Sequence, residues 1–222
     1  MERLKAAVVG MGFIGVAHVE ALRRAPYVDV VAIADSFGAK EKAERLGVPA
    51  GYADYEEMMD ECKPDCVHVC TPNSMHMDVA MAAIRRGINV VCEKPMARNA
   101  DEAQKMVDAV RESGVIGALN FHNRYYPIPY QMRRMVQNGE IGNIYHVQGG
   151  YLQDWLQHKT DFSWKLLSDK CGKTRATADL GSHWIDLAEY VTGQKVKEVF
   201  AEFKTIYPQR TQTTKDGPEE VD

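Results

Sequence analysis

The feature that most constrains this chain is a glycine-rich turn near its N-terminus. Gly10, Gly12 and Gly15 follow directly after the apolar run 4–9. The first glycine permits a tight turn, the second lets a ligand approach the backbone, and the third lets a helix pack closely on the strand. The following helix N-terminus offers N–H groups and a partial positive charge, which suit phosphates. The full motif is Gly10-Met11-Gly12-Phe13-Ile14-Gly15.

Short apolar runs and longer amphipathic runs alternate through the first 120 residues. Strands alternating with helices at these lengths pair in parallel through right-handed crossovers. With the glycine turn, this pattern predicts an α/β fold in which residues 1–121 form a Rossmann domain, a doubly wound parallel sheet. Strands are expected at 4–9, 28–34, 66–70, 89–92 and 115–120, helices at 14–24, 39–46, 76–86 and 100–113, and a helical turn at 55–60.

The pattern changes after residue 121, and we expect residues 122–222 to form a second α/β domain. Helices are predicted up to Asn138 and over 179–192, strands at 144–154 and 196–206, and a long loop at 157–175. The polar tail from residue 207 is expected to hang free or to meet further chain. Two strands are too few for a sheet with a covered face. The domain is therefore expected to be truncated or completed by a partner.

Asp35 ends the second predicted strand, twenty residues beyond Gly15. A carboxylate at this position accepts hydrogen bonds from the ribose 2′-hydroxyl of an adenine dinucleotide. The alternative is that Asp35 caps the next helix. The residues that follow provide no arginine for a 2′-phosphate, although Lys40 is nearby, so NAD is favoured over NADP as the cofactor.

Two further polar segments follow the third and fourth strands, where ligands bind in such sheets. Thr71, Pro72 and Asn73 come after the third strand and His76 opens the next helix, although Asn73 or Ser74 could simply cap that helix. Glu93 and Lys94 end the fourth strand before a proline. A lysine there, partly desolvated beside the cofactor, can polarise a substrate oxygen; a solvated surface lysine is the alternative.

A second group of polar residues lies on one predicted helix. Asp179, His183 and Asp186 are spaced i, i+4 and i+7, which places them on one helical face. A histidine between two carboxylates can act as a general base with a tuned pKa. A structural polar cluster and an Asp/His metal site are the alternatives. No further ligand is apparent, so no metal is expected.

The composition limits the kinds of partner and the cellular compartment that we expect for this chain. A net charge of −4 without a basic cluster gives no attraction for nucleic acid. No run approaches the ~18 apolar residues of a membrane helix, and the charged N-terminus does not resemble a signal peptide. Five cysteines without a CxxC pair indicate reduced thiols. We therefore expect a cytoplasmic protein with no membrane or nucleic-acid partner.

The motifs together resemble the glucose–fructose oxidoreductase, inositol dehydrogenase and MocA (Gfo/Idh/MocA) family. The resemblance covers essentially the whole chain. It rests on the glycine motif, Thr71–Asn73 with His76, Glu93-Lys94-Pro95 and the run from Asp179 to Asp186.

The resemblance implies a second domain with a large, mainly antiparallel open sheet that serves substrate binding and oligomerisation, in a homo-oligomer such as a dimer or tetramer. It implies that Lys94 contacts cofactor and substrate, that Asp179 orients the substrate and that His183 accepts the proton. It also implies a cis Lys94–Pro95 peptide and an arginine, Arg124, near the nicotinamide.

The chain departs from the family where Asn123 precedes Arg124 and where residues 171–175 replace a glycine-rich segment, so the substrate cannot be carried over. The predicted function is NAD-dependent oxidation of a secondary alcohol on a sugar or polyol. The second domain would supply pocket residues from among Tyr151, Trp155, Trp164 and Lys165, each also compatible with a core or surface position. An NAD-dependent glycosidase with transient redox chemistry and a non-catalytic dinucleotide sensor are the alternatives.

Overall fold

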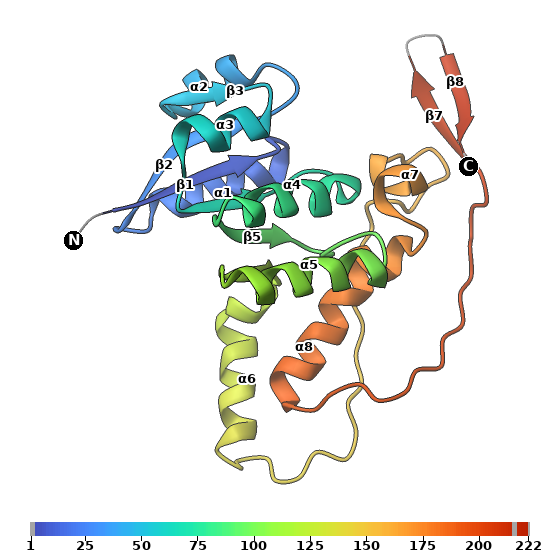
Figure 1. The fold of residues 1–222 in the computed structure, drawn as a ribbon. Coiled ribbons are helices and arrows are strands. Elements are labelled where there is room, and N and C mark those ends of the chain that lie inside the picture. Colours follow the sequence, from blue (N-terminus) through green and yellow to red (C-terminus); the bar gives the residue numbers. More distant parts are fainter. Residues whose placement is uncertain (1–2, 215–216, 222) are drawn as a thin grey trace. The chain divides into compact units, whose positions relative to one another are not determined.

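The computed structural model describes residues 3–214 and 217–221. The chain forms two compact units, Met1–Asn120 and Phe121–Asp222. The first unit contains a six-stranded sheet in the order β3-β2-β1-β4-β5-β6, with every neighbouring pair parallel (Figure 1). Its elements are β1 (Leu4–Val9), α1 (Phe13–Arg23), β2 (Val28–Ala34), α2 (Ala39–Leu46), β3 (Ala50–Tyr52), α3 (Tyr55–Cys62), β4 (Cys66–Val69), α4 (Asn73–Arg85), β5 (Asn89–Glu93), α5 (Ala100–Ser113) and β6 (Gly117–Asn120).

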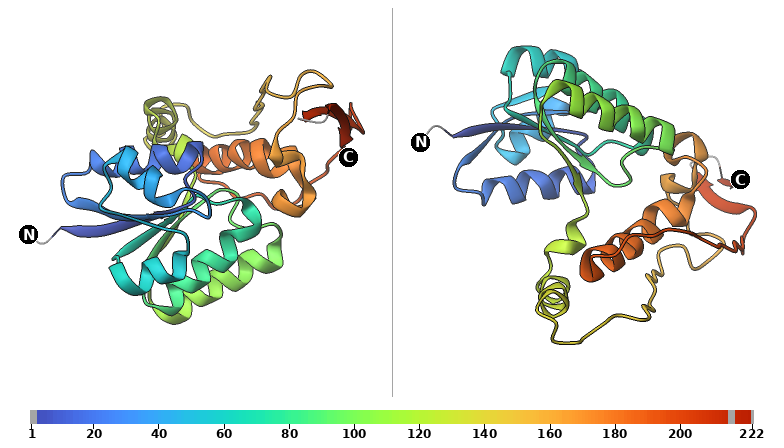
Figure 2. Two further views of the ribbon diagram at one scale, coloured as in Figure 1. Left: turned by 90° about the horizontal axis from the view of Figure 1, so that it is seen from above. Right: turned by 60° about the horizontal axis from the view of Figure 1, so that its bottom comes forward.

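Helices cover both faces of this sheet, which explains the apolar character of its central strands (Figure 2). Successive side chains of a strand point to opposite faces. Val8 and Ile33 pack in the core beneath α1 and α2. Their neighbours Ala7 and Ala32 pack in the larger core beneath α3, α4 and α5. The predicted doubly wound parallel sheet is confirmed.

Two elements between β2 and β4 differ from the prediction. The three-residue strand β3 was not predicted, because it is too short to show a period. The helical turn predicted at 55–60 is a complete helix, α3. Its N-terminus is capped by Asp54, whose carboxylate accepts hydrogen bonds from the N–H groups of Glu56 and Glu57 at 2.7 and 2.9 Å.

The second unit is built mainly from helices and long irregular segments. Helices α6 and α8 pack against each other (Figure 1). The elements are a 3₁₀ turn (His122–Tyr125), α6 (Pro127–Gln137), a second 3₁₀ turn (Trp164–Leu166), α7 (Ser168–Cys171), a π-helical turn (Thr177–Gly181), α8 (Ser182–Thr192), β7 (Arg210–Thr214) and β8 (Gly217–Val221).

The strands predicted in this unit were wrong. Segments 144–154 and 196–206 form no strand in the described chain, and the only sheet among the described residues of this unit is the antiparallel hairpin β7–β8. This hairpin lies in the tail from residue 207, which was expected to hang free or to meet further chain. A strand needs a hydrogen-bonding neighbour, and an alternating pattern alone does not supply one. The loop predicted at 157–175 contains the second 3₁₀ turn and α7.

Over the residues that the structure covers, no helix combines the length and apolar character needed to cross a membrane. Within the same residues, no three His, Cys, Asp or Glu side chains gather in a way that could hold a metal ion.

Candidate functional site

The glycine turn joins β1 to α1 and is shaped by steric contact. Gly10 has φ +91°, and a Cβ there would lie 2.7 Å from the backbone of Cys70. A Cβ at Gly15 would lie 1.9 Å from the Gly10 carbonyl oxygen, so only glycine fits. A Cβ at Gly12 would meet nothing within 4 Å. The space beside Gly12 is therefore open. Gly12 is also the N-cap of α1, and it offers no side chain to cap the N–H groups of the first turn.

Thr71 lies beside this turn at the carboxyl end of β4. Its Oγ1 is buried and has no hydrogen-bond partner among the described residues. A buried hydroxyl without a partner is costly unless a ligand or water pairs with it. The alternative that Asn73 or Ser74 caps α4 was wrong, since both residues lie inside the helix, Pro72 is the N-cap and no side-chain cap is formed there. An open helix N-terminus and an unsatisfied hydroxyl fit the phosphates of a dinucleotide.

Asp35 lies immediately beyond β2 and is held by three donors. Its Oδ2 accepts a hydrogen bond from the Met11 N–H at 2.7 Å, and its Oδ1 accepts one from the Phe37 N–H at 3.0 Å. The third donor is Lys42, whose Nζ lies 2.9 Å from Oδ1. Burial acts to raise the pKa of Asp35, but these donors together hold it below its ordinary value. Asp35 is therefore an ionised acceptor at the edge of the glycine turn.

The alternative role of Asp35 as a helix cap was wrong. Helix α2 begins after Gly38, its N-cap, and no side chain caps it. The nearby cation is also not the one expected from the sequence, since Lys40 is exposed whereas Lys42 forms the ion pair.

Glu93 belongs to a buried polar network at the end of β5. Its Oε1 lies 3.0 Å from His18 Nε2 and accepts a 2.5 Å hydrogen bond from Asn120 Nδ2. His18 Nδ1 in turn lies 2.8 Å from His68 Nδ1. Burial acts to raise the pKa of Glu93, but the donors, His18 first, hold it low. Burial and the neighbouring His18 lower the pKa of His68 to about 4.

Lys94 follows directly and its backbone N–H donates to Glu93 Oε2 at 3.2 Å. The Lys94–Pro95 peptide is cis, as the resemblance implied. Glu93 is itself 5% exposed and faces the network. The Glu93 carboxylate is therefore engaged by protein groups, among them the backbone N–H of Lys94.

His76 joins the two polar loops. It is buried, and its ring nitrogens lie 2.8 Å from the Pro95 carbonyl oxygen and 2.9 Å from that of Thr71. Burial lowers the pKa of His76 despite these contacts. The first unit thus brings together the glycine motif, Asp35, Thr71–Asn73, His76, Glu93 and Lys94 around the carboxyl ends of β1, β2, β4 and β5.

The second group lies entirely in the second unit. Asp179 lies in the π-helical turn and His183 in the first turn of α8. A π-turn widens the helix by about one residue and often occurs at functional sites.

The carboxylates of this group have cationic partners. Lys165 Nζ donates to both Asp179 oxygens at 2.8 and 3.1 Å. Arg124 binds Asp186 with both its Nε and Nη2, and the Nε distance is 2.7 Å. Each of the two carboxylates on this helical face is therefore paired with a basic side chain, which the sequence pattern alone did not indicate.

Aromatic rings hold His183, which is 3% exposed. Tyr151 stacks on its imidazole at 5.5 Å between centroids, and Phe121 makes an edge contact at 5.9 Å. A second imidazole, that of His122, lies 5.1 Å away. These contacts fix the ring plane of the residue predicted to accept a proton.

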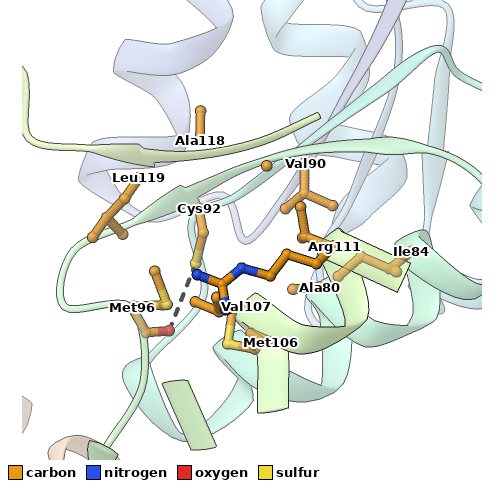
Figure 3. A pocket seen from close by; sticks show the side chains of 12 residues that line it. Ala80, Ile84, Val90, Cys92, Met96, Met106, Val107, Arg111, Ala118 and Leu119 are labelled. Carbon is orange, nitrogen blue, oxygen red and sulfur yellow. Dashed lines mark hydrogen bonds between the residues drawn. The ribbon is translucent and has the colours of Figure 1, made fainter. Parts of the chain in front are cut away.

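A cavity of about 240 Å³ lies elsewhere in the first unit, among α4, α5, β5 and β6 (Figure 3). Its lining is mostly apolar, and Arg111 extends across it toward Cys92. The Cys92 thiol makes a long, 3.9 Å hydrogen bond to the Met96 carbonyl oxygen. None of the residues predicted for the site lines this cavity.

Sequence reasoning missed four polar residues that contact the group in the first unit, namely His18, His68, Asn120 and Lys42. His18 comes three residues after Gly15, on the face of α1 that packs on the sheet, and His68 interrupts an apolar strand. A polar residue at a core position is the signal that could have found these two histidines.

Comparison with known families agrees with this architecture. Residues 4–121 match the Gfo/Idh/MocA family model described as an oxidoreductase family with an NAD-binding Rossmann fold. Residues 130–222 match the Gfo/Idh/MocA C-terminal domain. The first unit is thus an NAD-binding Rossmann domain.

The chain is similar to two curated dehydrogenases. Levoglucosan dehydrogenase from Pseudarthrobacter phenanthrenivorans is 31% identical over 221 residues, which cover 95% of this chain and 56% of the relative. D-glucoside 3-dehydrogenase from Escherichia coli is 31% identical over 214 residues, which cover 94% of this chain and 60% of the relative. The chain thus spans less than two thirds of the length of these relatives.

Solved structures that are similar to this chain are also oxidoreductases and dehydrogenases. An NAD-binding oxidoreductase from Klebsiella pneumoniae matches with a TM-score of 0.89 and 32% identity over 99% of this chain and 60% of its own. Levoglucosan dehydrogenase in complex with NADH and levoglucosan matches with a TM-score of 0.83 and 30% identity over 87% of this chain and 55% of its own. The chain described here belongs to the Gfo/Idh/MocA oxidoreductase family.

Proposed function

We propose that this protein is an NAD-dependent dehydrogenase that oxidises a secondary alcohol of a sugar, a polyol or a related small polar molecule. The observation that carries the proposal is that the N-terminus of α1, which no side chain caps, Asp35 and Lys94 all lie at the carboxyl ends of the parallel strands. The names of similar proteins support the substrate class, since they include levoglucosan, D-glucoside and myo-inositol dehydrogenases.

The first unit would hold the cofactor through charge and backbone groups. The N–H groups at the start of α1, next to Gly12, would bind the pyrophosphate. The ionised Asp35 carboxylate would accept hydrogen bonds from the adenosine ribose hydroxyls. Thr71 Oγ1 and the N-terminus of α4, at Pro72 and Asn73, would contact the cofactor. Bound NAD supplies the hydride acceptor of the reaction.

The chemical step would use Lys94 of the first unit together with His183 and Asp179 of the second unit. The Lys94 ammonium would donate a hydrogen bond to the reacting oxygen and stabilise the negative charge that develops there. His183 would take the hydroxyl proton as the carbinol carbon gives up its hydride and becomes a carbonyl carbon. Asp179 would accept a hydrogen bond from a second substrate hydroxyl and orient the ring.

Three other predicted residues would act through these groups. Glu93 and His76 would hold the backbone that carries Lys94 and Thr71, since their polar atoms engage other protein groups. Arg124 would fix Asp186 on α8 and thereby the helix that carries His183, in addition to the position near the nicotinamide that the family resemblance implies.

The test is NADH formation by the whole protein, followed by absorbance, with a panel of sugars, glycosides and cyclitols, alongside the dissociation constant for NAD. We expect turnover of at least one polyhydroxylated compound. Binding of NAD without turnover of any of them would contradict the proposal.

A further inference from the structure

We infer that Trp155, Lys165 and Asp179 form a binding platform for the closed ring of a sugar, so that cyclic substrates are preferred over open-chain polyols. The inference rests on the proposed function, because Asp179 is the carboxylate proposed to orient the substrate. It assigns a joint role to two of the candidate pocket residues and defines the shape of the molecule that the site takes.

The three side chains are linked by contacts within the second unit. Lys165 Nζ lies 2.8 and 3.1 Å from the two oxygens of Asp179. The same Nζ lies 5.4 Å from the centroid of the Trp155 ring, a cation–π distance. One ammonium group therefore joins an aromatic ring to the carboxylate that lies one turn before His183.

The platform remains accessible to a ligand. Trp155 is 55% exposed, and the side chains of Lys165 and Asp179 are 37% and 23% exposed. An indole has two faces and the lysine ammonium occupies the region over one of them. A large exposed aromatic beside a half-buried ion pair is typical of sites that combine apolar area with a few orienting polar groups.

The polar atoms of the platform match neighbouring hydroxyls. An ammonium has three N–H donors, of which two point to Asp179, and a carboxylate has about four acceptor positions. The pair can thus donate to one hydroxyl oxygen and accept from the next hydroxyl. Because Lys165 and Asp179 neutralise each other, this arrangement suits an uncharged diol.

The aromatic ring selects the closed form of such a diol. A pyranose or cyclitol ring presents a rigid, flat patch of C–H groups, which can lie on an indole face and lose contact with water. An open-chain polyol can carry hydroxyls of the same configuration but must lose the freedom of several torsions to present a comparable patch. The ring form therefore binds at a lower entropic cost.

The experiment compares 1,5-anhydro-D-glucitol with D-glucitol, which have the same hydroxyl configuration in closed and open form, together with levoglucosan and myo-inositol. Turnover is measured with NAD, and binding is measured by calorimetry in the presence of NADH. We expect the best closed-ring compound to bind at least about tenfold more tightly than D-glucitol. Trp155→Ala should raise its Kd and KM about tenfold or more and change kcat less, whereas Trp155→Phe should stay within about threefold of the wild type.

Lys165 is tested in parallel, since Lys165→Met should raise KM for the ring compounds and Lys165→Arg should restore part of the loss. Tyr27→Ala, which removes another exposed aromatic in the first unit, is the matched control. Equal affinity for closed and open compounds, unchanged Kd and KM in Trp155→Ala, or no binding of any ring compound would overturn the inference. Tight, Trp155-dependent binding without NADH formation would instead overturn the proposed function and leave the platform standing.

Discussion

Lys42 Nζ lies 2.9 Å from Asp35 Oδ1, so the carboxylate that would receive the adenosine ribose is already paired with a cation. The pair is partly buried, with side-chain exposures of 27% for Lys42 and 14% for Asp35. This arrangement reduces the repulsion between Asp35 and a 2′-phosphate without removing the acceptor that favours a 2′-hydroxyl.

The cofactor preference should therefore depend on both residues. Two charges ~4 Å apart interact with roughly 1–4 kcal/mol in partly wet surroundings, and 1.4 kcal/mol corresponds to tenfold. We expect the wild type to prefer NAD over NADP by at least ~10-fold. Lys42→Ala should widen this ratio by weakening NADP binding, and Asp35→Ser should narrow it.

Dissociation constants of both cofactors for each variant provide the measurement, with Lys40→Ala as the matched control because Lys40 is exposed. A wild type that binds NADP as tightly as NAD would contradict the role of Asp35, and a Lys42→Ala ratio equal to that of the control would contradict the role of Lys42.

Loss of the Lys94 ammonium should affect turnover rather than cofactor binding. A positioned proton-transfer or polarising group contributes typically ~10²–10⁴-fold, so kcat of Lys94→Ala should fall by that factor. The dissociation constant for NAD should change little, because the glycine turn and Asp35 are untouched. Lys105→Ala, an exposed lysine on α5, should behave as the wild type. Activity of Lys94→Ala within about threefold of the wild type would remove this lysine from the mechanism.

His183 should set the acidic limb of the pH profile for alcohol oxidation. A proton acceptor works only as the neutral imidazole, so activity should rise as the pH rises and the imidazole loses its proton. His183→Asn should abolish this limb and lower kcat. The profile is measured as kcat against pH with saturating NAD. The same limb in His183→Asn would show that another group accepts the proton.

His68 should make the folded state less stable in acid. Its pKa is lowered to about 4, mainly by burial and then by His18. Between that value and the ordinary ~6.5, the unfolded chain binds more protons at this position than the folded protein does. The free energy of unfolding should therefore fall as pH falls through this window, by up to roughly 3 kcal/mol from this group.

Urea denaturation at pH 7 and at pH 4.5 measures this effect. The loss of stability between the two pH values should be smaller in His68→Gln than in the wild type. His146→Gln, at an exposed histidine, should leave the difference unchanged. An equal loss of stability in His68→Gln and the wild type would show that His68 is not the group responsible.

The sequence alone was sufficient for the parts of this protein that depend on local backbone chemistry. Gly15 is required by its contact with the Gly10 carbonyl oxygen within one turn, Gly10 adopts a φ of +91° in the same turn, and Asp35 follows from its position at the end of a strand. Apolar runs covered on both sides predicted every strand of the parallel sheet except β3, which has only three residues. These features depend on short stretches of sequence, so they can be predicted from local sequence patterns.

The tertiary structure decided which groups meet. His18, His68 and Glu93 come from α1, β4 and β5. His18 contacts His68, which is 50 residues away in the sequence, and Glu93, which is 75 residues away. Whether Lys40 or Lys42 pairs with Asp35 depends on the rotation of α2 about its axis, and whether segment 144–154 becomes a strand depends on a hydrogen-bonding neighbour. Such pairings are set by how distant elements pack, because a hydrogen bond or ion pair requires the two partners at contact distance and the periodicity of neither segment specifies the other.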